Sequence, residues 1–338
     1  MKDGRMVGGR YRILNLLGTG GVGRTYRAFD ERLKRYVAVK EFFPIGIFKE
    51  GREGESPSTM LVGRYEKLKD RFLEEARKLA KIKHEGIPEV YDILEEKGSI
   101  YMIMELVEGK NLREFVGKMG KLDLNFALEK FLEMCDVVNF MHERGIIHCD
   151  LKPDNVIIKD DGRIKIVDFG SAREYIGEYT QTQPAFLTPG YAPIELYAFR
   201  IPKGPFTDVY SLGGILYFML TGRDPVSAPD RVGGVALERI GKFNPEVPEY
   251  IEKIVLKAMS MDPTERYRSV RDLKKALENE TVEFGRYERR GESGRDEEMD
   301  MEEAVFFSGC LKILILSIIT FILIFFTFRF CTRFLFIP

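Results

Sequence analysis

The spacing of apolar residues changes along the chain and predicts strands in its first part and helices later. Residues 11–17, 24–29 and 37–40 are short runs rich in β-branched and aromatic side chains, which favour extended backbone. Residues 65–82 repeat their apolar positions at helical spacing, and residues 209–220 form an apolar helix candidate. The pattern predicts an α+β fold in which a small strand-rich part precedes a larger helical part.

A short hairpin is predicted between two further apolar strands, residues 156–158 and 164–167. Between them lies Asp161-Gly162, a pair that favours a two-residue turn. A turn centred on this pair would place Asn155 opposite Asp168 at the open end of the hairpin. An amide oxygen beside a carboxylate, with positions left for water and phosphate, suits Mg²⁺. On this feature alone, a surface hairpin with two ordinary polar ends is an equal alternative.

A glycine-rich segment, residues 18–23, separates the first two predicted strands. A dinucleotide-binding site would need a helix to begin at these glycines, but β-branched and aromatic residues follow them. The segment is therefore expected to cap a hairpin, where bare backbone amides can approach phosphate oxygens.

Lys40 ends the third predicted strand and could reach the same phosphates. Glu75 lies on the apolar face of the first predicted helix, together with Phe72, Leu79 and Ile82. Because burying a lone carboxylate is costly, Glu75 needs a partner, and Lys40 is the obvious one. A solvated lysine at a strand end is the alternative reading.

The order of these features closely resembles that of the eukaryotic-like serine/threonine protein kinases of bacteria, over residues 11–277. The other motifs that carry the resemblance are Met104-Glu105-Leu106-Val107-Glu108-Gly109, His148-Cys149-Asp150-Leu151-Lys152-Pro153-Asp154-Asn155, Asp168-Phe169-Gly170, Pro193-Ile194-Glu195, Asp208 and Arg266. The resemblance implies a bilobal protein kinase fold across residues 11–280. A small antiparallel β-sheet lobe with one helix would occupy about residues 11–104, and a larger, mostly helical lobe about residues 110–280.

The resemblance also implies a role for each matching residue. Asp150 would accept the proton of the substrate hydroxyl, Lys152 would lie by the γ-phosphate of ATP, and Thr188 would hydrogen-bond the catalytic loop. Asn155 and Asp168 would hold Mg²⁺. The residues expected to bind ATP are Gly18, Thr19, Gly20, Gly21, Val22, Gly23, Thr25, Ala38, Lys40, Glu75, Met104, Glu105, Val107 and Ile157.

Two further expectations concern the helical lobe. Glu195 would pair with Arg266, and Asp208 would hold the backbone of the catalytic loop. Cys149 stands where many family members have an arginine that clasps a phosphate on the activation segment. We therefore hypothesise that this segment is ordered without phosphorylation of Thr180 or Thr182, and that Cys149 is a passive small side chain. A redox-sensitive Cys149 is the alternative, which the neighbouring carboxylate of Asp150 disfavours.

The implied function is an ATP- and Mg²⁺-dependent kinase of serine and threonine hydroxyls in proteins. The alternative is a membrane-tethered, nucleotide-binding pseudokinase scaffold, which the complete set of catalytic residues disfavours. A formal net charge of -1 over 338 residues gives no reason to propose nucleic acid as a partner. The four cysteines and three histidines are too scattered for a zinc site or a disulfide framework. Residues 42–63 are an insertion with a polar loop, and the sequence does not assign it a role.

The composition changes abruptly after residue 280. Residues 281–304 are charged and predict a flexible linker. Residues 305–328 would span about 36 Å as a helix, enough to cross a bilayer, and residues 329–338 form a short tail. We predict a single-pass membrane anchor with the kinase domain in the cytoplasm. Arg329 and Arg333 on the far side oppose the positive-inside tendency, so a re-entrant or interfacial segment and a buried helix stay open as alternatives. The sequence leaves self-association of this segment undecided.

Overall fold

The computed structural model describes residues 4–20, 23–44, 62–169, 173–174, 187–198 and 201–279. The predicted linker, membrane anchor and tail all lie outside these residues, as do positions 45–61 of the predicted insertion. Within the part of the chain that the structure describes, no helix is both long and apolar enough to cross a membrane. The compact unit that contains the fold ends at Glu278.

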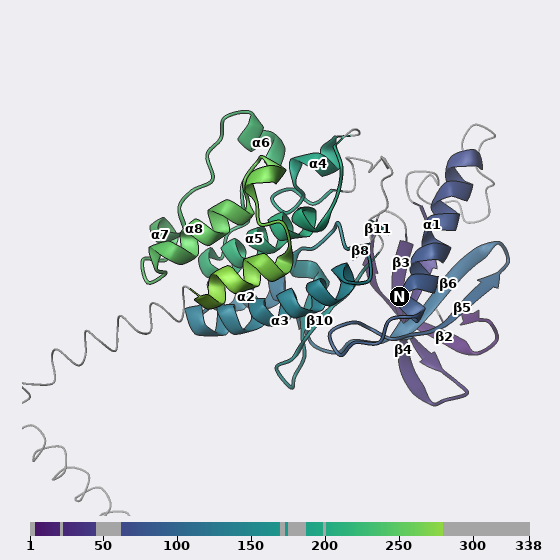
Figure 1. Ribbon diagram of the computed structural model, residues 1–338. Coiled ribbons are helices and arrows are strands. Elements are labelled where there is room, and N and C mark those ends of the chain that lie inside the picture. Colours follow the sequence, from purple (N-terminus) through teal and green to yellow (C-terminus); the bar gives the residue numbers. More distant parts are fainter. Residues whose placement is uncertain are drawn as a thin grey trace, which may run out of the picture. The chain divides into compact units, whose positions relative to one another are not determined.

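The first lobe is an antiparallel sheet of six strands with one long helix against it (Figure 1). The strands follow the order β1-β2-β3-β4-β6-β5. Their bounds are β1 Met6–Val7, β2 Tyr11–Thr19, β3 Gly23–Asp30, β4 Arg35–Phe42, β5 Val90–Glu96 and β6 Ser99–Glu105. The three strands predicted in this region are confirmed, each a little longer than the apolar run that indicated it.

Helix α1, Val62–Ala80, packs its apolar face on the sheet. It begins and ends earlier than the predicted range of residues 65–82, and Ile82 is buried in the turn that follows it. Phe72 of the helix and Phe42 of β4 are both buried, with ring centroids 5.5 Å apart. This contact fixes the helix against the strand that carries Lys40.

The second lobe is mostly helical and packs around α5 (Figure 1). Every residue from Thr207 to Thr221 of this helix is buried, as the apolar run predicted. Gly222 ends the helix in the left-handed conformation. The helices are α2 Leu112–Met119, α3 Leu124–His142, α4 Ile194–Tyr197, α5 Pro205–Thr221, α6 Ala228–Val232, α7 Ile240–Phe243 and α8 Glu249–Ala258.

Short strands form two small sheets that contact α2, α3 and α5 of the helical lobe. One small sheet has the order β10-β9-β7, and a second pairs β11 with β8. Their bounds are β7 Lys110–Asn111, β8 Ile146–Ile147, β9 Val156–Ile158, β10 Ile164–Ile166 and β11 Arg173–Glu174. Single turns of 3₁₀ helix occupy Pro153–Asn155 and Pro263–Glu265. The bilobal fold expected from the sequence is therefore present.

The hairpin between β9 and β10 forms, but its predicted turn is wrong by one residue. The loop has three residues, 160–162, and the Lys159 amide donates to the Arg163 carbonyl across it at 2.9 Å. The Gly162 amide donates to the Lys159 carbonyl at 2.9 Å, and Gly162 has a φ of 82°. A two-residue turn centred on Asp161-Gly162 would need positive φ at both residues, but Asp161 is not among the residues with positive φ, so Gly162 takes the left-handed position that follows the turn.

The register of the hairpin shifts accordingly. Ile158 pairs with Ile164, and the Val167 amide donates to the Asn155 carbonyl at 2.8 Å. Asn155 therefore lies opposite Val167 and not opposite Asp168, which corrects the predicted pairing. Asp168 follows with a φ of 61°, a conformation that is costly for a residue with a side chain. This backbone reversal still brings Asp168 to the same cavity as Asn155.

Candidate active site

A cavity of about 940 Å³ is lined by residues of both lobes. Gly21 and Val22 lie outside the described residues, and every other residue predicted from the sequence to bind nucleotide, hold metal or act in catalysis lines this cavity. They are Gly18, Thr19, Gly20, Gly23, Thr25, Ala38, Lys40, Glu75, Met104, Glu105, Val107, Asp150, Lys152, Asn155, Ile157, Asp168 and Thr188.

The glycine-rich segment forms the tip of the β2–β3 hairpin, as its composition predicted. The Gly20 amide donates to the Gly23 carbonyl at 2.8 Å and closes the tip. A Cβ on Gly23 would lie 2.6 Å from the Glu41 carbonyl oxygen of β4, so only glycine allows this approach. A Cβ on Gly20 would lie 3.8 Å from a carboxylate oxygen of Asp168. The hairpin tip thus lies over the metal-binding candidate.

Lys40 is buried between two carboxylates, and its predicted pairing with Glu75 is confirmed. Lys40 Nζ lies 3.1 Å from Glu75 Oε1 and 2.8 Å from Asp168 Oδ1. Burial alone would lower the pKa of Lys40, but the two negative charges outweigh it and raise that pKa. The charge of Lys40 in turn lowers the pKa of Asp168 to about 2, while burial raises the pKa of Glu75. Lys40 and Asp168 are therefore both charged at neutral pH.

The loop that carries Asp150 is held from below by Asp208, as predicted. The backbone amides of His148 and Cys149 donate to the two Asp208 oxygens at 2.8 and 2.9 Å. His142 Nε2 also lies 2.8 Å from Asp208 Oδ2. Burial acts to raise the pKa of Asp208, but these contacts outweigh it and lower that pKa. Cys149 has a φ of 62°, and this costly conformation directs the chain from β8 toward the cavity.

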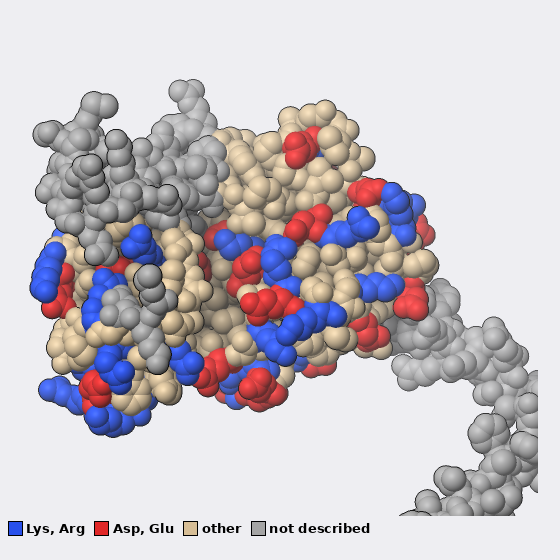
Figure 2. Space-filling view, turned by 180° about the vertical axis from the view of Figure 1, so that it is seen from behind, with Lys and Arg blue, Asp and Glu red and all other residues tan. Residues whose placement is uncertain are grey.

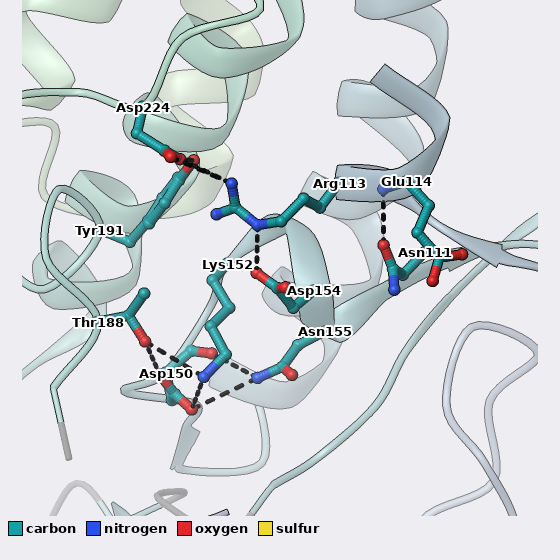
Figure 3. A network of polar contacts seen from close by, with 10 residues as sticks. All are labelled: Asn111, Arg113, Glu114, Asp150, Lys152, Asp154, Asn155, Thr188, Tyr191 and Asp224. Atoms are coloured by element: carbon teal, nitrogen blue, oxygen red, sulfur yellow. Dashed lines mark hydrogen bonds and ion pairs between the residues drawn. The ribbon is translucent and has the colours of Figure 1, made fainter. Parts of the chain in front are cut away.

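The three predicted catalytic side chains form one network (Figure 3). Lys152 Nζ donates to Asp150 Oδ2 at 3.0 Å and to Thr188 Oγ1 at 3.2 Å. The Thr188 hydroxyl donates to Asp150 Oδ1 at 3.3 Å. Burial raises the pKa of Asp150, and Lys152 offsets part of that effect. Asp150 is thus a carboxylate of raised basicity, held in place by two donors.

Asn155 joins this network to the predicted metal position. Its Nδ2 donates to the Asp150 carbonyl at 2.9 Å and lies 3.4 Å from Asp150 Oδ2. Figure 3 shows the amide oxygen turned away from Asp150. Among the described residues, no group of three or more His, Cys, Asp or Glu side chains could hold a metal ion. One carboxylate and one amide oxygen suit a cation that keeps waters or phosphate oxygens as its other ligands.

Several residues of the site were not predicted from the sequence. An arginine in the first turn of α2, Arg113, donates to Asp154 of the catalytic loop at 2.8 Å. Lys165 of β10 is buried and its Nζ lies 2.6 Å from Glu105 Oε2, at the hinge between the lobes. A lysine inside an apolar strand was the available signal for Lys165. The cavity is also lined by Leu106 of the predicted hinge and by residues without a predicted role: Leu17, Leu79, Pro88, Val90, Met102, Gly109, Asn111, Glu114, Asp154, Val167 and Phe169.

Two contacts brace the helical lobe beneath the site. The predicted pair of Glu195 and Arg266 is confirmed by bidentate contacts of 2.7 and 3.0 Å between fully buried side chains. Cys149 is buried in an apolar cluster with Ala192 and Leu196, which follow the activation segment. The passive role expected for Cys149 stays a prediction. Thr180 and Thr182 lie outside the described residues.

Comparison with known proteins shows the family. Residues 11–278 match the protein kinase domain family. The serine/threonine-protein kinase PrkC of Bacillus subtilis (strain 168) is 31% identical over 307 residues, which cover 88% of this chain and 45% of PrkC. The serine/threonine-protein kinase PknA of Mycobacterium tuberculosis (strain ATCC 25618 / H37Rv) is 33% identical over 276 residues, covering 79% of this chain and 60% of PknA.

A solved structure described as the PpkA-294 apo form has a TM-score of 0.69 and 27% sequence identity, covering 82% of this chain and 99% of that one. The chain spans 38 to 60% of the length of the curated relatives it matches. It belongs to the protein kinase domain family, among the eukaryotic-like bacterial serine/threonine kinases that its motifs indicated.

Proposed function

We propose that this chain is a protein kinase that uses ATP and Mg²⁺ to phosphorylate serine and threonine hydroxyls of proteins. One observation carries the proposal: a single cavity joins the cluster of Lys40, Glu75 and Asp168 to the network of Asp150 and Lys152. The first arrangement suits a polyphosphate and a divalent cation, and the second suits a hydroxyl group that must lose its proton.

The lining of the cavity fits ATP. Ala38, Met104 and Ile157 contribute apolar surface at the side near the hinge, where a purine would lie. Lys40 supplies a fixed positive charge beneath the glycine tip, where phosphates would lie. A site of this kind combines mostly apolar walls with a few placed polar groups, as small-molecule sites generally do.

The residues present also fit Mg²⁺. Asp168, with a pKa of about 2, is ionised at neutral pH, and the Asn155 amide group has its nitrogen committed to Asp150. Its oxygen is therefore the atom available to a cation. Mg²⁺ is usually bound through one or two protein oxygens together with waters and substrate phosphates.

ATP, when bound with Mg²⁺, supplies the phosphoryl group and the charge neutralisation that the transfer needs. Asp150 accepts the proton from the oxygen of the substrate hydroxyl, because its carboxylate is fixed by two donors and its basicity is raised by burial. Lys152 places a positive charge beside the same oxygen atoms. Thr188 orients both side chains. The protein thus contributes position and electrostatics more than covalent chemistry.

The choice of serine and threonine in proteins is supported by the names of the relatives, which are serine/threonine-protein kinases. Transfer of radioactive phosphate from γ-labelled ATP to a generic protein substrate tests the proposal. We expect label with the wild type in Mg²⁺, and none with Asp150→Asn, with Lys40→Met or after chelation. Tight nucleotide binding without transfer under any condition would favour the pseudokinase scaffold instead.

We also propose that residues 305–328 anchor the kinase domain at the cytoplasmic face of a membrane. The length and apolar composition of this segment support the proposal. Fractionation of expressing cells with a carbonate wash tests it. Full-length protein in the soluble fraction would contradict the anchor.

A further inference from the structure

Arg113 occupies a site made of two carboxylates beside the active site (Figure 3). Its Nε donates to Asp154 Oδ2 at 2.8 Å. Its Nη1 donates to both oxygens of Asp224 at 3.0 and 3.1 Å. These two carboxylates come from segments 70 residues apart, the catalytic loop and the turn after α5, and the guanidinium bridges them.

Two aromatic rings complete the surroundings of this guanidinium. Its central carbon lies 5.1 Å from the ring centre of Phe218 and 5.9 Å from that of Tyr191. The Tyr191 hydroxyl donates to Asp224 Oδ1 at 2.5 Å and so fixes the second carboxylate. Paired carboxylates with aromatic faces are the surroundings that a planar guanidinium prefers. These groups therefore form a site suited to an arginine side chain, and Arg113 of the same chain occupies it.

The site lies beside the position that a substrate hydroxyl must reach. Asp154 immediately precedes Asn155 and lines the same cavity as Asp150. Tyr191 lies three residues after Thr188, which hydrogen-bonds Asp150. The site is open to solvent, because the side chains of Arg113, Asp154 and Asp224 are 34, 43 and 53% exposed. A peptide that brings its hydroxyl to Asp150 must lay its flanking residues near these groups.

On the basis of the proposed function, we propose that Arg113 determines specificity by filling this guanidinium site and excluding an arginine of the substrate peptide from it. With Arg113 present, one positive charge already satisfies the best-oriented oxygens of both carboxylates. Without it, two negative charges and two aromatic faces would be left for a basic side chain of the substrate. A lysine would fit less well, because its compact ammonium lacks the planar fork that donates to both carboxylates and stacks on the aromatic rings.

A peptide series measures this exclusion. Each peptide has one serine in a neutral background, and a single arginine is moved from four positions before the serine to four positions after it. The readout is the ratio of kcat/KM for the arginine peptide to kcat/KM for the neutral parent, which cancels general changes in activity. We expect ratios within about 3-fold of one at every position for the wild type, and a ratio of about 10 or more at one position for Arg113→Ala, as a tenfold change corresponds to only about 1.4 kcal/mol.

Matched variants isolate the cause. Arg113→Ala combined with Asp224→Asn should lose most of the gain, because one carboxylate of the site is gone. Arg144→Ala removes an arginine that stacks on Phe140, donates to the Phe140 carbonyl and does not line the cavity, and it should keep the wild-type ratios. If circular dichroism shows that Arg113→Ala does not fold, Arg113→Gln, which keeps most of the stem, takes its place.

Peptide binding separates this inference from the proposed function. Fluorescence anisotropy with the same peptides labelled, in the presence of ADP, needs no phosphate transfer. If the wild type phosphorylates nothing, the proposed kinase activity fails, yet tighter binding of one arginine peptide to Arg113→Ala would still support the filled site. Ratios and affinities unchanged within about 2-fold at every position in a folded Arg113 variant would overturn it. A wild-type preference of more than about 10-fold for an arginine peptide would overturn it as well.

Discussion

Lys40 and Arg266 are both buried cations paired with buried carboxylates, yet their surroundings differ. Arg266 and Glu195 satisfy each other with two contacts and are fully buried, so their cluster is closed. Lys40 binds Glu75 and also Asp168, whose side chain is 41% exposed and lines the cavity. Burial of an ion pair does not by itself indicate catalysis. What distinguishes the open cluster is a further carboxylate that faces a cavity large enough for a substrate.

Lys40→Met should give the largest effect on activity and a small effect on folding. Removing the cation takes away the fixed positive charge beneath the glycine tip, and we expect phosphate transfer to fall by about 10³-fold, as for other preorganised electrostatic groups. Glu75 can become neutral, because burial already raises its pKa. Initial rates with labelled ATP and a thermal melt measure the two effects.

Lys130→Met is the matched control for that prediction. Lys130 is also buried, and its Nζ lies 2.7 Å from Glu129 and 2.6 Å from Glu133. It does not line the cavity. We expect activity within about 3-fold of the wild type, since no residue of α3 lines the cavity. An equal loss of activity in Lys40→Met and Lys130→Met would mean that Lys40 supports activity only by stabilising the fold.

Arg266→Met should show the opposite behaviour. It leaves Glu195 as an unpaired charge with no exposed surface, and breaking a buried pair in this way costs about 3–5 kcal/mol of unfolding free energy. Urea unfolding measures the loss, and any loss of activity should follow the folded fraction. Arg271→Met, which removes an exposed pair with Glu143, should cost no more than about 1 kcal/mol. Full stability of Arg266→Met would show that the closed cluster is not a brace.

The open cluster of Lys40, Glu75 and Asp168 could be predicted from the sequence because each of its elements has a local sequence pattern. The apolar face around Glu75 demands a partner, the glycines mark a hairpin tip, and Lys40 ends a strand, so their combination predicts a phosphate site. The predicted hairpin register was wrong because Asp161 does not take the positive φ of a two-residue turn, which leaves a three-residue loop that the pair Asp161-Gly162 also permits. The free-energy difference between the two-residue turn and the three-residue loop cannot be predicted from so short a sequence pattern.

The contacts of Arg113 lay beyond prediction for a different reason. Its two partners, Asp154 and Asp224, are exposed acidic residues at ordinary loop positions, and nothing local distinguishes them from solvated charges. Only the packing of α2, the catalytic loop and the end of α5 brings them to one guanidinium. Glu195 and Arg266 are also distant, 71 residues apart in the sequence, and only the family resemblance indicated their pairing.

The pH dependence of the stability of Asp208→Asn tests the buried contacts beneath the catalytic loop. Favourable contacts with His142 and with the amides of His148 and Cys149 hold the pKa of Asp208 below its usual value of 3.8. A lowered folded pKa means that this stabilisation is fully present above about pH 4 and is lost as the pH falls through the folded value. At pH 7 we expect the variant to be about 1–3 kcal/mol less stable than the wild type.

That difference should shrink as the pH falls below about 4, because the unfolded chain then takes up a proton at this carboxyl that folded Asp208, with its lowered pKa, does not. Urea unfolding of both proteins at pH 7, 5, 4 and 3 measures it. A constant difference across this range would show that the charge of Asp208 does not matter.

We expect the smallest effect on activity from substitutions in the activation segment, whose end packs against Cys149. Cys149 packs against Ala192 and Leu196 in place of an arginine that could bind a phosphate, so the end of the segment is held by apolar contacts. We expect Thr180→Ala combined with Thr182→Ala to keep the rate within about 2-fold of the wild type as purified, and dephosphorylation of the wild type, with the phosphatase then removed, to change its rate no more than that. Thr188→Ala is the contrasting variant, because its hydroxyl binds Asp150 and Lys152 directly, and its rate should fall at least about 10-fold. A collapse of the double variant alone would mean that a phosphate orders the segment through some cation other than the missing arginine.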